Sequence, residues 1–337
     1  MKNIICIVGN PNCGKTTLFN ALTGSKQEVG NWPGVTVDKK TGRYSFEGND
    51  VEIVDLPGIY SITPASTSGE DERIARDYIL TDEAQAVINI VDASNLERNL
   101  YLTAQLIEMR VPMVVAVNML DIAKNHKIEV DLKALQQALG CPVVGLVAAR
   151  EQGVRELQKT VAEFLKNPQL PPMNVSFEER IEKAREAITQ GLRKEGVERP
   201  EWFALQLVEG APGIEDKLPA EAYAKVKKIV DEVNAAYDGD ADIVVADARY
   251  SFVNRITQKA LIRHGEMSNT MTDKIDRVVL NRWLGLPIFL AIMYVMFLFT
   301  QNLGGAFIDF FDITFAGIFV DGFGRLLEAV GTPEWLK

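Results

Sequence analysis

The sequence contains little cysteine and little histidine. Its 337 residues include three cysteines and two histidines. Cys6, Cys13 and Cys141 lie far apart in the chain and form no C-x-x-C pair, so the sequence predicts neither a disulfide framework nor a zinc site. A reducing compartment is the simplest interpretation of this cysteine usage.

The sequence also lacks a basic stripe and a secretion signal. The formal net charge is -10, and no Lys/Arg-rich segment is present that could follow a phosphodiester backbone, so we expect no nucleic-acid partner. The N-terminal apolar run covers only Ile4 to Val8 before a polar loop begins, whereas a secretion signal needs a longer one. We therefore expect a buried strand here, and a cytoplasmic location for the N-terminal part.

Short apolar runs alternate with helix-length segments through the first half of the chain. This alternation is typical of an α/β domain with a mostly parallel, doubly wound sheet. Residues 35–46 lead through a polar turn into the second run, a pattern that predicts a hairpin with one antiparallel strand. We expect a first helix at Lys15–Leu22 and a domain that covers residues 1–166. The other strands are expected at Ile4–Val8, Val51–Val54, Val87–Val91, Met113–Val117 and Val143–Val147.

The character of the chain changes after Lys166. Residues 167–173 are rich in proline, which predicts a linker or a sharp turn. From Phe177 to about Met267, apolar residues recur at spacings of three and four with charges on the other face, which predicts helices. We therefore expect a helical domain at 167–270, which contains no catalytic signature.

Charged residues are absent between Trp283 and Ile308. About 20 helical residues cover the roughly 30 Å hydrocarbon layer of a bilayer, so we expect a juxtamembrane segment and a first transmembrane helix at 271–303. A buried core helix is the alternative. Basic residues precede the apolar run, which favours a cytoplasmic N-terminal side. Two aspartates interrupt the next apolar stretch, so 304–337 is expected to be an interfacial or re-entrant membrane segment.

The most specific local motif is the phosphate-binding loop from Gly9 to Thr16, GNPNCGKT. It matches G-x-x-x-x-G-K-[ST] directly after an expected strand and at the start of an expected helix, which is the context that this motif requires. Backbone amides and the helix N-terminus would surround a phosphate chain, and the Lys15 ammonium would reach the outer phosphates. The Thr16 hydroxyl would coordinate magnesium. The motif therefore predicts a nucleotide site in a P-loop domain.

Two later motifs follow expected strands, at the edge of the sheet where ligands bind in open α/β folds. They are Asp55-Leu56-Pro57-Gly58 and Asn118-Met119-Leu120-Asp121. Asp55 would hold magnesium through water, and the Gly58 amide would contact the γ-phosphate. Together with the phosphate-binding loop, these motifs predict a GTPase.

The second of these motifs selects the base. The Asp121 carboxylate can accept hydrogen bonds from the guanine N1–H and exocyclic amine, which adenine does not present in that arrangement. Asn118 would brace the loop, and Met119, in place of the usual lysine, would lie against the base. Residues 147–149 have the place of the loop that caps the guanine carbonyl, although Ala148 replaces the usual serine or threonine.

Catalysis depends on residues near the phosphates. Thr36, in a glycine-rich stretch with the position of a mobile switch, can add a hydroxyl to magnesium and sense the γ-phosphate; a surface turn is the alternative. Hydrolysis would be an in-line attack by water. Ile59 stands where common small GTPases have a water-orienting glutamine, so we expect slow turnover. Asn12 either holds a monovalent cation against the phosphates or only tightens the loop.

The expected site therefore combines catalytic, metal-binding and nucleotide-binding groups. The catalytic groups are Lys15, Thr36, Gly58 and Asn12. Magnesium would be bound by Thr16, Thr36 and Asp55, and the monovalent cation by Asn12. The nucleotide-binding residues are Gly9, Asn10, Pro11, Asn12, Cys13, Gly14, Lys15, Thr16, Thr17, Gly34, Val35, Thr36, Asp55, Leu56, Pro57, Gly58, Asn118, Met119, Leu120, Asp121, Val147, Ala148 and Ala149.

Several segments together resemble the ferrous iron transporter B family. They are GNPNCGKTTLFNALTG, VGNWPGVTVDKK, VDLPGIYS, VDASNLERNLYLT, NMLD and DKIDRVVLNRWLGLPIFLAIMYVMF. The resemblance covers the whole chain in order and implies a GTP- and GDP-binding cytoplasmic GTPase domain, a helical domain that slows nucleotide release, and a membrane domain that carries iron(II). It also implies potassium as the cation at Asn12, a bacterial inner-membrane location, and lipid, small accessory transport proteins and further copies of the chain as partners.

One convincing span is too few for a transporter. We therefore expect the chain to be part of a longer protein, with most of the membrane domain beyond Lys337. The alternatives are a membrane-anchored regulatory GTPase without transport function and a ribosome-associated GTPase. A third is an oligomerisation and anchoring module in which the nucleotide is only a structural switch.

Overall fold

The computed structural model describes residues 3–24, 27–64, 69–81, 83–264, 278–281, 284–322 and 325. The chain divides into two compact units, Met1–Glu266 and Met267–Lys337. Each unit is considered by itself.

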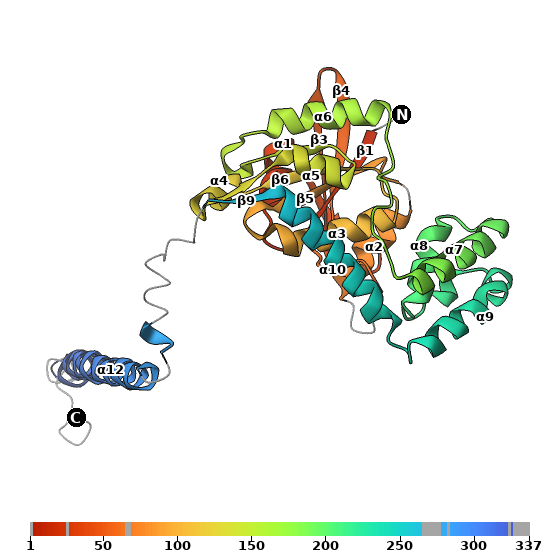
Figure 1. Ribbon diagram of the computed structural model, residues 1–337. Coiled ribbons are helices and arrows are strands. Elements are labelled where there is room, and N and C mark those ends of the chain that lie inside the picture. The colour runs from red at the N-terminus through yellow and green to blue at the C-terminus, as the bar shows by residue number, and fades with distance from the viewer. Residues whose placement is uncertain are drawn as a thin grey trace. The chain divides into compact units, whose positions relative to one another are not determined.

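A seven-stranded sheet forms the centre of the first unit, as the sequence predicts (Figure 1). Its order is β2-β3-β4-β1-β5-β6-β8. All pairings from β4 to β8 are parallel, whereas β3 pairs antiparallel with both of its neighbours. The strands are β1 Asn3–Gly9, β2 Gln27–Asn31, β3 Asp38–Phe46, β4 Asn49–Asp55, β5 Ala86–Asp92, β6 Met113–Asn118 and β8 Val143–Gly145.

Helices cover both faces of this sheet because alternate residues of its central strands are apolar on both sides. In β1, Ile5 and Ile7 pack in a core with apolar residues of α1 and α6, whereas Cys6 and Val8 pack on the other side with α2, α3 and α5. The helices of this part are α1 Lys15–Thr23, α2 Glu70–Leu80, α3 Leu96–Glu108, α4 Leu120–Asn125, α5 Leu132–Leu139 and α6 Val154–Lys166. The result is a three-layer α/β/α fold with the carboxyl ends of β1, β4 and β6 at one edge.

Four helices follow the proline-rich segment. They are α7 Glu179–Lys194, α8 Pro200–Val208, α9 Ala220–Ala236 and α10 Ala241–Ala260. The first three pack on one another, and α10 packs on α3 and α5. Apolar residues of α10, including Val245, Phe252 and Ile256, therefore belong to the same core as α3.

Two features of this unit differ from the pattern read in the sequence. The edge strand β2 lies in a stretch for which we predicted only a switch loop, and a second sheet pairs β7, Ile128–Val130, with β9, Leu261–Arg263. β7 and β9 are short, and their ladder pairs Ile128 with Arg263, so tertiary packing and not a local pattern brings them together. β2 pairs with the next strand, β3, but its residues QEVGN lack the apolar alternation that indicates a strand. In the same way, Val147 forms a bridge to Gln152 and does not continue β8.

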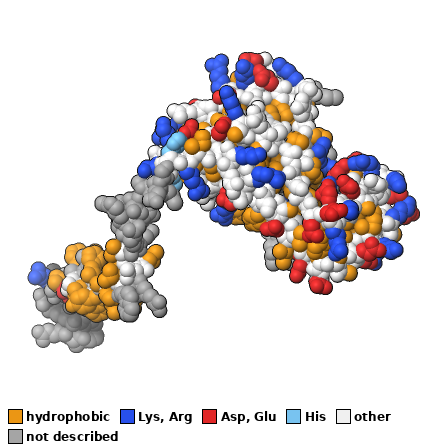
Figure 2. Space-filling model, in the orientation of Figure 1, with side chains coloured by type: hydrophobic (Ala, Val, Ile, Leu, Met, Phe, Trp, Pro, Cys, Tyr) orange, Lys and Arg blue, Asp and Glu red, His pale blue; other side chains and the backbone are white. Residues whose placement is uncertain are grey.

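The second unit contains a long apolar helix, α12, Gly285–Phe315, which continues as a π-helical segment at Ala316–Gly322. Within the described part of the chain, Gly285–Phe319 is long and apolar enough to cross a membrane by length and composition, with a hydropathy of 1.8. Most of its large apolar side chains are exposed, and Figure 2 shows apolar side chains gathered in this part of the chain.

The helix passes the boundary that we placed at residue 303 without a break. Gly304 and Gly305 lie within α12, and so does Asp312. An aspartate interrupts an apolar run in the sequence but does not break the backbone hydrogen bonds of a helix. The helix therefore continues past the point at which the apolar run ends. The predicted juxtamembrane residues 271–277, residues 282–283 and most of the predicted segment after Gly322 lie outside the described residues.

Candidate functional site

The phosphate-binding loop joins the end of β1 to the start of α1. Asn12, with φ 65°, and Gly14, with φ 89°, both have left-handed backbone conformations. A Cβ on Gly14 would lie 2.3 Å from the Asn118 carboxamide, and one on Gly9 would lie 2.5 Å from the Ile90 carbonyl. Glycine is therefore needed at both ends of the loop, because neighbouring strand ends approach its backbone. The loop ends at the N-terminus of α1, which favours an anion.

Cys13 lies in the middle of this loop but is buried. Burial raises the pKa of its thiol to about 11. The thiol therefore stays neutral at physiological pH and adds no negative charge beside a phosphate chain.

The sheet brings the phosphate-binding loop and the Asp-Leu-Pro-Gly motif together. β1 and β4 are adjacent and parallel, and their register pairs Ile7 with Asp55. Lys15 Nζ lies 2.6 Å from Asp55 Oδ1, and their side chains are only 12% and 7% exposed. An ammonium and a carboxylate thus stand side by side at the start of α1, where a phosphate chain and its magnesium ion would compete for them.

Asn118 joins the three loops that we assigned to the nucleotide. It ends β6, and its Nδ2 donates a hydrogen bond of 3.0 Å to the Cys13 carbonyl. Its Oδ1 accepts a hydrogen bond of 2.9 Å from the Ala148 N–H. One buried carboxamide therefore holds the phosphate-binding loop, its own motif and residues 147–149 in one fixed arrangement.

Asp121 lies beside this junction, in the first turn of α4. Its Oδ1 accepts a hydrogen bond of 3.0 Å from the Ile122 N–H, and its Oδ2 lies 3.5 Å from Arg150 Nη2. The carboxylate is 31% exposed, so it can receive the edge of a base. Met119 precedes it with φ 62°, and its methyl group is directed at Gly14, since it would lie 3.7 Å from a Cβ there.

Thr36 is not brought to the phosphate-binding loop. It is exposed in the turn between β2 and β3, and among the described residues it makes no hydrogen bond to Thr16 or Asp55. The turn is fixed by Trp32, which is buried against Tyr78 with their ring centroids 5.3 Å apart. Gly34 and Val35 belong to the same turn. Of the predicted site residues, the structure therefore gathers Gly9–Thr17, Asp55–Gly58, Asn118–Asp121 and Val147–Ala149, and leaves Gly34–Thr36 apart.

The donor set near α1 fits a magnesium ion. The Asp55 carboxylate lies beside Lys15, and the Thr16 hydroxyl is exposed on the next residue. Carboxylate and hydroxyl oxygens, completed by water and phosphate oxygens, are the hard ligands that magnesium prefers.

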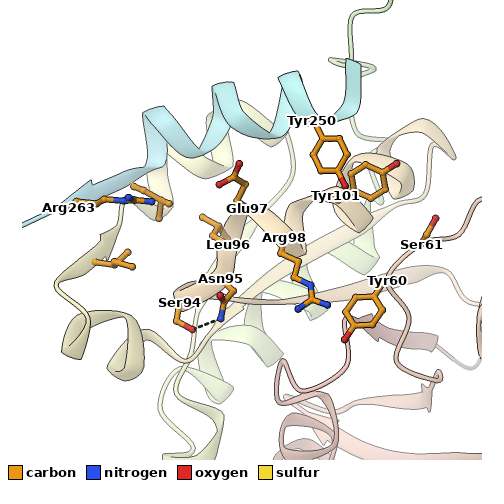
Figure 3. Close-up of a pocket in the computed structure, with 12 residues that line it drawn as sticks. Tyr60, Ser61, Ser94, Asn95, Leu96, Glu97, Arg98, Tyr101, Tyr250 and Arg263 are labelled. Carbon is orange, nitrogen blue, oxygen red and sulfur yellow. Dashed lines mark hydrogen bonds between the residues drawn. The ribbon is translucent and has the colours of Figure 1, made fainter. Parts of the chain in front are cut away.

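A cavity of about 160 Å³ borders the phosphate-binding loop. Its lining is polar, and it includes Asn10 and Asn12 from the loop, Asp92 from the end of β5, and Arg98 and Asn99 from α3. A larger cavity of about 620 Å³ shares Tyr60 and Arg98 with it and extends to α10 and β9 (Figure 3). The Arg98 guanidinium lies 4.5 Å from the centre of the Tyr60 ring, and Figure 3 shows these two side chains next to each other.

Three residues near the site were not singled out in the sequence. Arg98 contacts Tyr60, Gln105 hydrogen-bonds to residues 61–63, and Arg150 reaches Asp121. Arg98 and Gln105 lie inside a helix with no local motif, so only the packing of α3 reveals them. Arg150 directly follows residues 147–149, and this position next to the predicted base-capping loop is the one feature of the sequence that indicates a place near the site.

Comparison with known proteins covers most of the chain. The family model "Ferrous iron transport protein B" matches residues 3–161, and "FeoB cytosolic helical domain" matches residues 177–262. A curated relative, the Fe(2+) transporter FeoB of Legionella pneumophila (strain Lens), is 41% identical over 334 residues, which are 98% of this chain and 43% of the relative. The chain thus spans less than half the length of that relative.

Solved structures match the first unit. The cytosolic domain of L. pneumophila FeoB has a TM-score of 0.68 and 36% identity over 77% of this chain and 99% of that one. An S. thermophilus NFeoB mutant bound to GDP has a TM-score of 0.68 and 36% identity over 78% of this chain and 100% of that one.

Proposed function

Because this chain belongs to the ferrous iron transport protein B family, we propose that its first domain hydrolyses GTP in the cytoplasm and that the complete protein carries iron(II) across the bacterial inner membrane. The observation that carries the GTPase part is the junction at Asn118, which joins the phosphate-binding loop to the base-binding loops. A related chain with the same fold was solved with GDP bound. The iron(II) part is supported by the curated relatives.

The reaction would begin with the opening of the Lys15–Asp55 ion pair. The Lys15 ammonium turns to the outer phosphates and neutralises the charge that develops on them. A bound magnesium ion would supply positive charge that stabilises the negative charge on the phosphates. Asp55 and the Thr16 hydroxyl would hold the ion, and Thr36 would join them when its turn moves toward the γ-phosphate. Because Lys15 Nζ lies 2.6 Å from Asp55 Oδ1, neither charge is buried alone.

Hydrolysis by this site should be slow. Ile59 follows Gly58 and is buried, so this position offers no polar side chain to orient water. The remaining chemical contributions are the Gly58 amide, the Lys15 ammonium and the bound cations. Catalysis then comes from positioning and from charge neutralisation.

The test has a biochemical and a cellular arm. The purified chain with magnesium should release phosphate from GTP faster than GTP decays in water. It should release phosphate from ATP about 100-fold more slowly than from GTP, because adenine cannot form the two hydrogen bonds to Asp121. Cells without their own ferrous iron uptake should take up radiolabelled iron(II) when the complete gene is expressed. Hydrolysis without uptake would point to a regulatory GTPase, whereas phosphate release at the spontaneous rate would leave the nucleotide as a structural switch.

Potassium is the second cation of the proposal, with Asn12 as its ligand. Asn12 is exposed with a left-handed backbone at the centre of the phosphate-binding loop, so its carboxamide is free to turn toward the phosphates. We expect phosphate release to be about tenfold faster in potassium than in sodium, a change equal to about 1.4 kcal/mol in the barrier. Asn12→Ala should abolish this difference and leave GDP affinity within about twofold. Equal rates in the two salts for the unmodified chain would contradict the assignment.

The remaining parts of the chain complete this proposal. Residues 1–166 form the GTPase domain, and 167–270 form a regulatory helical domain that slows nucleotide release. The segment 271–303 leads into the membrane through the first half of α12, and 304–337 lies in or near the bilayer. The exposed apolar surface of α12 supports contact with lipid. Small accessory proteins and further copies of the chain are proposed partners.

A further inference from the structure

Gln105 is a buried polar residue of α3 that binds the segment after the Asp-Leu-Pro-Gly motif. Its side chain is 3% exposed. Its Oε1 accepts a hydrogen bond of 3.0 Å from the Ile62 N–H. Its Nε2 donates hydrogen bonds of 2.9 Å to Ser61 Oγ and of 2.9 Å to Thr63 Oγ1. Three consecutive residues of the segment are therefore attached to one carboxamide.

The same segment is attached to the phosphate-binding loop at its other end. The Ile59 N–H donates a hydrogen bond of 3.2 Å to the Gly9 carbonyl. Gly58 packs against this loop so closely that a Cβ on it would lie 3.3 Å from Pro11 Cα. Ile59 and Ile62 are both buried in the core. The place of the Gly58 amide is thus set by how residues 59–63 are held.

The contacts of α3 with this segment differ in how far they are exposed to solvent. Arg98 reaches Tyr60 through a ring contact, and Tyr60 is 43% exposed, so this contact is partly solvated. The Gln105 hydrogen bond to Ile62 is buried, and those to Ser61 and Thr63 are part-buried. Losing them would leave the Ile62 N–H and the Gln105 carboxamide without their partners inside the protein. Gln105 therefore holds residues 61–63 in one conformation.

From this geometry we infer that Gln105 is a positioning residue for GTP hydrolysis. Its carboxamide fixes residues 61–63 so that the Gly58 amide meets the γ-phosphate of GTP. It acts through the segment and not on the reacting water, since its oxygen and its amide group are engaged with residues 61–63. The inference rests on the proposed GTPase function. GDP has no γ-phosphate, so its binding should not depend on this contact.

The test removes the contact from each side separately. Gln105→Leu keeps most of the side-chain volume and removes all three hydrogen bonds, and the double variant Ser61→Ala with Thr63→Val removes two of them without touching α3. Each should lower kcat for GTP about tenfold, which corresponds to about 1.4 kcal/mol in the barrier. The affinity for GDP should stay within about twofold. Phosphate release and titration with a fluorescent GDP analogue measure the two quantities.

A matched control lies on the same helix. Thr103 is fully buried and accepts a hydrogen bond of 2.6 Å from Asn89 Nδ2, away from residues 59–63. Thr103→Val should lower stability and leave kcat unchanged. If the unmodified chain hydrolyses GTP and both test variants keep its kcat, or if they lose GDP affinity in the same proportion as kcat, the positioning role is wrong. If the unmodified chain releases no phosphate, the proposed function itself fails.

Discussion

Arg249→Met is expected to destabilise the first unit by about 3–5 kcal/mol, because it leaves two buried carboxylates without their counter-ion. Arg249 Nε lies 2.9 Å and 3.0 Å from the two carboxylate oxygens of Glu108. Its Nη2 lies 2.9 Å from Glu209 Oε2. All three side chains are at most 3% exposed. Methionine fills a similar volume, so the loss measures charge and hydrogen bonding more than packing.

The ion cluster holds two parts of the chain together. Glu108 ends α3, in the segment that matches the first family model, whereas Glu209 and Arg249 lie in the segment that matches the second. Glu108 is also one turn beyond Gln105 on α3. The helix α3 therefore contacts the segment after Gly58 at one point and the helical part of the chain at another.

The cost of Arg249→Met should depend on pH. Burial raises the pKa of Glu108, and the guanidinium opposes this effect. Without the guanidinium the folded-state pKa rises further above the unfolded value, so the folded variant takes up a proton that the unfolded chain does not. When a carboxyl group has a higher pKa in the folded than in the unfolded state, the free energy of unfolding falls as pH rises from the unfolded-state pKa to the folded-state pKa. The difference in unfolding free energy between variant and unmodified chain should therefore be smaller near about pH 5 than near about pH 8.

Urea unfolding of the chain in mild detergent, followed by tryptophan fluorescence, measures both effects. Arg255→Met is the matched control, because Arg255 lies on the same helix and is exposed. It should cost about 1 kcal/mol or less. A cost for Arg249→Met no larger than that of the control, or one that grows at acid pH, would contradict the account of the cluster.

Asp121→Asn is expected to lower the affinity for GDP by about 100- to 1,000-fold and to raise the affinity for xanthosine diphosphate. Two hydrogen bonds from guanine to a carboxylate are worth about 1.5–3 kcal/mol each. The asparagine amide turns one acceptor into a donor, which opposes the guanine amine and suits the carbonyl that xanthine has at that position. Asn118 keeps its hydrogen bonds to the neighbouring loops, so these loops stay in place, and besides the base the change touches only the solvated contact between Asp121 and Arg150.

Titration with fluorescent guanine and xanthine nucleotides measures this switch. Asp131→Asn is the matched control: Asp131 caps α5 by accepting hydrogen bonds from the N–H groups of Lys133 and Ala134, and asparagine caps helices equally well. It should leave both affinities unchanged. GDP affinity that is unaltered by Asp121→Asn would remove Asp121 from the base site.

Much of the fold is readable in the sequence because its signals are local. The apolar runs that predict β1, β4, β5 and β6 are contiguous, and burial on both faces of a parallel sheet requires apolar residues at consecutive positions. The phosphate-binding loop is readable for a similar reason, since Gly14 needs a left-handed backbone and stands next to Lys15 in the chain. The short strands β7 and β9 are not predicted because each is hydrogen-bonded to a partner distant in sequence. β2 pairs with the next strand, β3, but its residues QEVGN lack the apolar alternation that indicates a strand.

The sequence by itself determined the class of nucleotide, since the phosphate loop, Asp55 and Asp121 each follow a strand end within a short motif. Only the tertiary structure decided what α3 does. Gln105 and Ile62 are 43 positions apart, and Arg249 and Glu108 are 141 positions apart. Along the sequence these polar residues look like the solvated face of amphipathic helices. They became buried partners only because α3 packs against residues 59–63 on one side and against α10 on another, which no local pattern encodes.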